Sequence, residues 1–170
     1  KRFSSEPLLR RGISACLRVG GEKELDILVS FVGRKDLPAN IRAEALATLG
    51  GWASPSVLDR VDGRFRGKIE RDPALVTAKV RALANEILQS KDAEILVSTA
   101  QMLSALKIND YNDALLKLQQ HTDPSVRSAM LTALHELKYD KIEIVIRRGM
   151  EDKDVTVRTA AVGLLNELDI

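Results

Sequence analysis

Apolar residues recur every three or four positions along most of the chain and are separated by short polar turns. This spacing places the apolar side chains on one face of a helix, which is typical of amphipathic helices packed against one another. We therefore expect an all-α fold. The predicted helices cover residues 6–18, 22–33, 39–52, 55–61, 73–90, 93–107, 111–121, 124–138, 141–151 and 155–168.

Three of these segments form an internal repeat. They are DAEILVSTAQMLSAL from Asp92, DPSVRSAMLTALHEL from Asp123 and DVTVRTAAVGLLNEL from Asp154, which align without gaps at a spacing of 31 residues. A more distant copy, LPANIRAEALATLGGW, places Ile41 and Trp52 at matching positions. Because each repeat leaves an apolar face that only a neighbour covers, this period predicts stacked helix pairs. The segment IEIVIRR alternates like a strand, but its place in the repeat predicts a helix.

Helix pairs of about 31 residues, with Val-Arg after a turn aspartate in DPSVRS and DVTVRT, resemble HEAT repeats. The resemblance implies a right-handed α–α superhelix in which the second helix of each pair lines the concave side. We expect residues 1–170 to form a single HEAT-like repeat domain. The first residues, KRFSSEP, are typical of a cut inside a longer polypeptide, so we expect the domain to belong to a larger multidomain protein.

Charged residues recur with the same period. Asp123 and Asp154 precede their helices, as N-caps do, and Arg127 and Arg158 follow four residues later. This spacing puts opposite charges one helical turn apart. It predicts a ladder that ties adjacent repeats together, or alternatively a row of ligand-binding arginines. Leu96 stands at the equivalent place in the third copy and would interrupt such a row, which favours the ladder.

The composition narrows the classes of function. With 26 basic and 24 acidic residues, the net charge of +2 gives no overall attraction to nucleic acid or anionic membranes. The single Cys16 and the two histidines lack the spacing of a metal site, and there is no glycine-rich phosphate loop. We therefore predict no catalytic, metal-binding or cofactor-binding residues, no bound cofactor and no enzymatic activity of this chain. No apolar run is long enough to span a bilayer.

The stretch WASPSVLDRVDGRFRGKIERD, residues 52–72, interrupts the helical pattern after the short helix expected at 55–61. Residues 60–71 carry a local net charge of +3, and glycines flank Arg-Phe-Arg. Loops held by a regular scaffold often carry function. Phe65 either packs back onto the helices near Trp52 or anchors a partner, with arginines contacting carboxylate or phosphate. The candidate interface residues are Trp52, Arg60, Asp62, Arg64, Phe65, Arg66 and Lys68.

Residues 43–72, including LATLGGWASPSVLDRVDGRFRG, also resemble a more particular family. They are similar to the HEAT segment of large bacterial membrane-bound dehydrogenase or haem-binding proteins, in which the repeats join a quinoprotein sugar dehydrogenase-like β-propeller to a cytochrome c domain. The resemblance implies a non-catalytic scaffold that contacts neighbouring domains or another protein, in the periplasm or at the cell surface. It implies that quinone and haem ligands lie outside this chain.

The alternative function is that of a nucleic-acid-binding helical-repeat protein. The basic loop and Trp52 favour it. The balanced overall charge disfavours nucleic acid as a partner, because binding of several phosphates normally needs a broad basic face.

Overall fold

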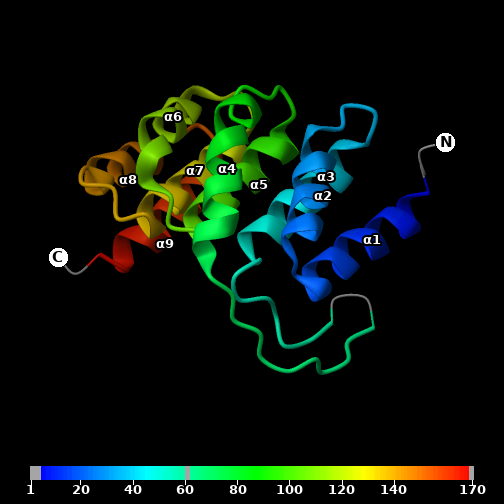
Figure 1. Cartoon of the computed structure of the whole chain (residues 1–170). Helices are drawn as coiled ribbons and strands as arrows, with labels where there is room; N and C mark the ends of the chain where they lie inside the picture. The colour runs from blue at the N-terminus through cyan, green and yellow to red at the C-terminus, as the bar shows by residue number, and fades with distance from the viewer. Residues whose placement is uncertain (1–4, 60–61, 169–170) are drawn as a thin grey trace. The chain divides into compact units, whose positions relative to one another are not determined.

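The computed structural model describes residues 5–59 and 62–168, and the structure in these residues is all-helical (Figure 1). The prediction of an all-α fold is confirmed. The α-helices are α1 (Glu6–Val19), α2 (Glu22–Gly33), α3 (Ala39–Gly50), α4 (Pro73–Ile87), α5 (Ala93–Ala105), α6 (Asn112–Lys117), α7 (Pro124–Glu136), α8 (Ile142–Met150) and α9 (Val155–Asn166). Two 3₁₀ turns, η1 (Asn109–Tyr111) and η2 (Leu118–Gln120), flank α6.

Most of the predicted helices are present with shifted ends, and two differ in kind. IEIVIRR belongs to α8, as the repeat predicts and the alternating pattern alone would not. The helix expected at 111–121 is shorter, because only Asn112–Lys117 is α-helical between the 3₁₀ turns. The helix expected at 55–61 is wrong: residues 55–59 are not helical, and residues 60–61 lie outside the described part of the chain.

The chain divides into two compact units, residues 1–102 and 103–170, and each is described by itself. In the first, α3 packs against α2 and α1, and α4 packs against α2. In the second, α9 packs against α8 and α7, and α7 packs against α6. In both units, therefore, one helix contacts its immediate partner and an earlier helix as well. The expectation of a single repeat domain over residues 1–170 stays a prediction.

Each unit has its own buried apolar residues, which come from the periodic positions of the sequence. Leu25, Leu28, Ile41, Leu46 and Leu49 are fully buried in the first unit. Val126, Leu134, Ile146, Val157 and Ala161 are buried in the second. Burying one such leucine, isoleucine or valine side chain stabilises the fold by about 1.5 to 3 kcal/mol. Packing of these faces, rather than helix propensity alone, therefore stabilises the helices.

The repeat extends to the helix ends. Asp72, Asp123 and Asp154 are the N-caps of α4, α7 and α9, and each carboxylate accepts a hydrogen bond from the backbone N–H two residues later. At the other end, Lys107 and Lys138 both have positive φ, 56° and 54°. The following N–H groups, of Ile108 and Tyr139, donate to the carbonyls of Leu103 and Leu134 at 3.0 Å. Helices one period apart thus terminate in the same way.

Candidate protein interface between α3 and α4

The segment that follows α3 folds back on itself as a short irregular hairpin. Leu58 and Phe65 form an isolated antiparallel bridge, the N–H of Asp59 donates to the Arg64 carbonyl at 2.8 Å, and the N–H of Arg66 donates to the Val57 carbonyl at 2.7 Å. Gly63 has φ 70°, which favours glycine at the turn. These hydrogen bonds between the two arms of the hairpin form in place of the helix expected at 55–61, because they use backbone groups that a helix would pair locally.

Arg71 fastens the end of this segment to α1. Its guanidinium donates to the Leu17 carbonyl at 2.6 Å and to the Trp52 carbonyl at 2.7 Å, and it lies 4.8 Å from the centre of the Trp52 ring. Burial lowers the pKa of Arg71, and the nearby charge of Arg18 lowers it further. The Leu17 carbonyl lies in the last turn of α1, where carbonyls lack helical partners. Arg71 therefore supplies a hydrogen-bond donor to the end of α1 and, by the same contact, holds the segment after α3 against α1.

Arg18 fastens the hairpin itself. Its guanidinium donates to the carbonyls of Leu58 at 2.9 Å and Ser56 at 3.2 Å. Its Nε also lies 3.6 Å from the carboxylate of Asp59, which is only 9% exposed. Arg66 Nε approaches the same carboxylate at 3.3 Å. A buried carboxylate is strongly destabilising once its cationic partners are removed. Because one partner of Asp59 is Arg18 of α1, the stability of the hairpin depends on its contact with α1.

The outer side of the hairpin is apolar and basic. Phe65 is 74% exposed, and Leu58, paired with it across the bridge, is 51% exposed. Val57 is 40% exposed. The side chain of Arg64, next to Phe65, is 77% exposed. An exposed phenylalanine beside an aliphatic residue and an arginine has the composition of a protein-binding hot spot.

The structure separates the seven candidate interface residues into three groups. Arg64, Phe65 and Lys68 lie on the exposed side, and Lys68 pairs with Glu70 at 2.6 Å. Asp62 and Arg66 pair with each other at 3.0 Å within the hairpin. Trp52 is 1% exposed, so it supports the segment from the core and does not reach the surface. Arg60 lies outside the described residues.

Two residues that hold the segment, Arg18 and Asp59, were not among the sequence-based candidates. Arg71 was counted only for its charge. Nothing in the sequence indicates that Arg18 and Arg71 bind carbonyls more than 35 residues away. A cavity of about 370 Å³ lies between α1 and the hairpin and is lined by charged groups, including Arg11, Arg18, Asp59 and Arg66. Within this cavity, Asp59 already pairs with Arg18 and Arg66.

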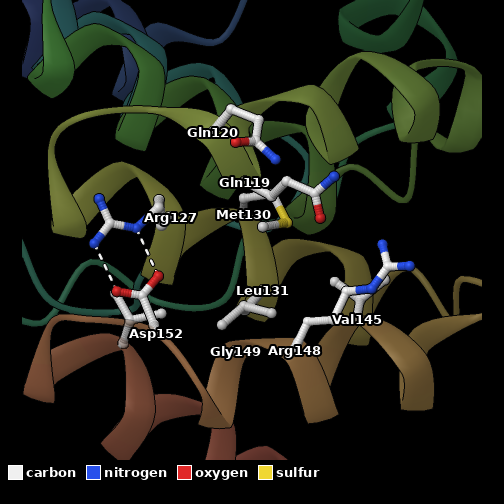
Figure 2. Close-up of a pocket in the computed structure, with 10 residues that line it drawn as sticks. Gln119, Gln120, Arg127, Met130, Leu131, Val145, Arg148, Gly149 and Asp152 are labelled. Atoms are coloured by element: carbon white, nitrogen blue, oxygen red, sulfur yellow. Dashed lines mark hydrogen bonds and ion pairs between the residues drawn. The ribbon is translucent and has the colours of Figure 1, made fainter.

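The four residues of the predicted ladder lie at the ends of α7 and α9. Asp123 and Asp154 cap these helices, and hydrogen bonds from Ser125 lower the pKa of Asp123. Arg127 donates from Nε and Nη2 to the two carboxylate oxygens of Asp152, at 2.7 Å each (Figure 2). Arg127 thus connects α7 to the turn before α9, and its hydrogen-bonded carboxylate is that of Asp152, not the Asp123 suggested by the sequence spacing.

The Arg127–Asp152 pair is largely buried, with side chains 5% and 15% exposed. Hydrogen bonds from Arg127 lower the pKa of Asp152 to about 2, and the same bonds raise the pKa of Arg127. The pair borders a cavity of about 340 Å³ whose apolar wall includes Met130 and Leu131. In Figure 2, Gln119 and Arg148 lie on the side of the cavity opposite the ion pair.

Metal-ligating side chains do not gather in the described part of the chain. Within residues 5–59 and 62–168, no group of three or more His, Cys, Asp or Glu side chains is placed to hold a metal ion. Burial raises the pKa of the Cys16 thiol. None of the helices searched in these residues is long and apolar enough to cross a bilayer. No protein-family model matches the chain, and no curated protein matches it either.

Proposed function

We propose that this chain is a non-catalytic helical-repeat scaffold that binds a protein partner through the exposed side of the hairpin at residues 57–68. The observation that carries this proposal is the exposure of Phe65, 74%, on a segment whose backbone is fixed to α1 by Arg18 and Arg71. A solvated phenylalanine on a fixed backbone loses little conformational entropy on binding, which favours its use as an anchor.

The proposed scaffold is a right-handed superhelix of HEAT-like helix pairs. Repeated helix contacts within each unit, the shared caps and the 31-residue period support a right-handed superhelix of HEAT-like pairs. The resemblance of residues 43–72 supports a place beside a sugar dehydrogenase-like propeller and a cytochrome c domain in an extracytoplasmic redox protein. The hairpin lies within these residues, so the neighbouring domain is the partner we expect.

The charges of the hairpin favour a protein over nucleic acid. Arg66 pairs with Asp59 and Asp62, and Lys68 pairs with Glu70, so much of the local positive charge is already balanced. Phosphate backbones need several free cations on one face. We expect no binding of a labelled duplex DNA at low salt in an anisotropy titration, and saturable binding lost at high salt would favour the nucleic-acid alternative instead.

The test of the protein interface is site-specific photo-crosslinking in cells of the source organism. A photoreactive phenylalanine analogue replaces Phe65 in one variant and Ile144, an exposed residue of α8, in the control. We expect one discrete cross-linked peptide pair from position 65, identified by mass spectrometry and joining it to the neighbouring domain of the same polypeptide or to a second protein, reduced at least fivefold when Arg64→Ala and Leu58→Ser are added, and none from position 144. Equal adducts from both positions, or none from position 65, would contradict the proposed interface.

A further inference from the structure

The cavity beside the Arg127–Asp152 pair has the size of a small-molecule site. Its volume is about 340 Å³, and ligand pockets in proteins typically enclose about 300 to 1,000 Å³. A water-sized group takes about 30 Å³ in a liquid, so the cavity fits a molecule of roughly ten non-hydrogen atoms. All of its lining residues lie within residues 103–170, so one compact unit forms the whole cavity.

The wall of the cavity is apolar and closely packed from behind. Met130 and Leu131 of α7 and Val145 of α8 line it, and each is at most 4% exposed. A Cβ at Gly149 would lie 2.8 Å from the Leu131 side chain and 3.1 Å from that of Ala161. Both side chains therefore pack directly on the backbone of α8, which holds the apolar wall in one position, as in preformed ligand sites.

An arginine without an acidic partner lies at one end of the cavity. In Figure 2, the side chains of Arg148 and Gln119 lie on the side opposite the buried ion pair. In the part of the chain that the structure describes, no carboxylate forms an ion pair with Arg148. Arg147, the preceding residue of α8, does have one, because it pairs with Glu143 at 2.7 Å.

The charges around the cavity favour an anionic ligand. Its charged lining residues are two arginines and one aspartate, and Arg127 and Asp152 neutralise each other through hydrogen bonds of 2.7 Å. The positive charge of Arg148 is left over. A carboxylate complements this charge, because a guanidinium can donate two parallel hydrogen bonds to its two oxygens. The side-chain amide of Gln119 is a further donor.

We propose that this cavity binds a small monocarboxylate with an apolar chain of up to about eight carbons. The carboxylate binds Arg148 and the amide of Gln119, and the chain lies against Met130 and Leu131. The flexible thioether of Met130 adapts to the shape of the chain. This ligand site is additional to the hairpin at residues 57–68 and does not depend on the function proposed for it.

The test is a titration of the 170-residue chain with sodium octanoate, which has the predicted size. Isothermal titration calorimetry measures the affinity, and spectra of ¹³C-methyl methionine locate the ligand among Met102, Met130 and Met150. We expect saturable binding with a Kd below about 1 mM. The Met130 signal, assigned with M130L, should shift, and the signal of Met102 should stay unchanged because Met102 lies outside residues 103–170.

A neutral ligand and two arginine variants separate carboxylate recognition from general apolar binding. Octanamide, of the same length, should bind at least tenfold more weakly than octanoate. R148Q should weaken octanoate about tenfold and leave octanamide within twofold, as expected for the loss of a charge-assisted contact. R147Q is the matched control, because Arg147 is an exposed arginine of the same helix that pairs with Glu143 and does not line the cavity.

Several outcomes would overturn the proposal. They are the absence of a saturable Met130 shift, equal affinities for octanoate and octanamide, and equal losses of affinity in R147Q and R148Q. Phe65→Ser, in the hairpin, should leave octanoate binding unchanged, so the failure of one proposal does not affect the other.

Discussion

The two compact units use the same chemistry at their turns in different patterns. In residues 103–170, Arg127 and Arg158 each donate to two carbonyls five and six residues earlier. In residues 1–102, Arg18 binds carbonyls 38 and 40 residues away, and Arg71 binds carbonyls 19 and 54 residues away. Periodic arginines build a repeat, whereas the two unique arginines fasten a single irregular segment to it. Only the first use leaves a signature in the sequence.

The largest effect should come from breaking the periodic pair. Arg127→Leu removes the cation that pairs with the largely buried Asp152 carboxylate, which keeps only the Asp154 N–H, and removes the guanidinium donor to the carbonyls of His121 and Thr122. We expect the free energy of unfolding to fall by about 3 kcal/mol. Urea unfolding followed by circular dichroism and by tyrosine fluorescence measures it, because Tyr111 and Tyr139 both lie in residues 103–170.

Arg148→Leu is the matched control for this variant. Arg148 borders the same cavity and is exposed. We expect it to change the free energy of unfolding by no more than about 0.5 kcal/mol. A loss as large as that of Arg127→Leu would show that any cation beside the cavity stabilises this unit, and the periodic contact would lose its special role.

The next largest effect should come from the unique arginine of the other unit. Arg71→Leu removes the donors to the Leu17 and Trp52 carbonyls and the contact with the Trp52 ring. We expect a loss of roughly 2 kcal/mol, from two charge-assisted hydrogen bonds that water partly replaces. Trp52 is the only tryptophan and lies in residues 1–102, so its emission reports this unit.

Gly20→Ala tests the same contact from the α1 side. Gly20 has φ 72°, and a Cβ there would lie 2.3 to 2.5 Å from the Arg71 guanidinium. The substitution should cost about 1 kcal/mol from backbone strain alone, and more while Arg71 is present. If Gly20→Ala costs the same in the wild-type and Arg71→Leu backgrounds, Arg71 does not occupy that place in solution.

Acid should weaken the periodic pair by a smaller amount, because Arg127 keeps its two carbonyl partners when Asp152 is protonated. The pKa of Asp152 is lowered from 3.8 to about 2, so its contribution is complete above pH 3.8 and is lost as the pH falls toward 2. Urea midpoints measured from pH 5 to pH 2 should fall less steeply for Asp152→Asn than for the wild type. Parallel slopes would show that Asp152 titrates normally.

The sequence predicted what repeats and failed where contacts are unique. The apolar period, the aspartate caps and the helical state of IEIVIRR were all readable because each recurs or is local. The helix expected at 55–61 was wrong because hydrogen bonds between Asp59 and Arg64 and between Arg66 and Val57 compete with helical pairing. The burial of Trp52 under Arg71 depends on one long-range contact, for which a single sequence holds no pattern.

The smallest effect on stability is expected at the residue most important for the proposed function. Phe65→Ser should change the free energy of unfolding by less than about 0.5 kcal/mol, because Phe65 is 74% exposed. Asp59→Asn, on the other arm of the hairpin, should cost more, because its buried carboxylate faces Arg18 and Arg66. Trp52 emission in urea measures both. If Phe65→Ser costs as much as Asp59→Asn, Phe65 packs onto the helices in solution, and a residue needed for packing is not available to anchor a partner.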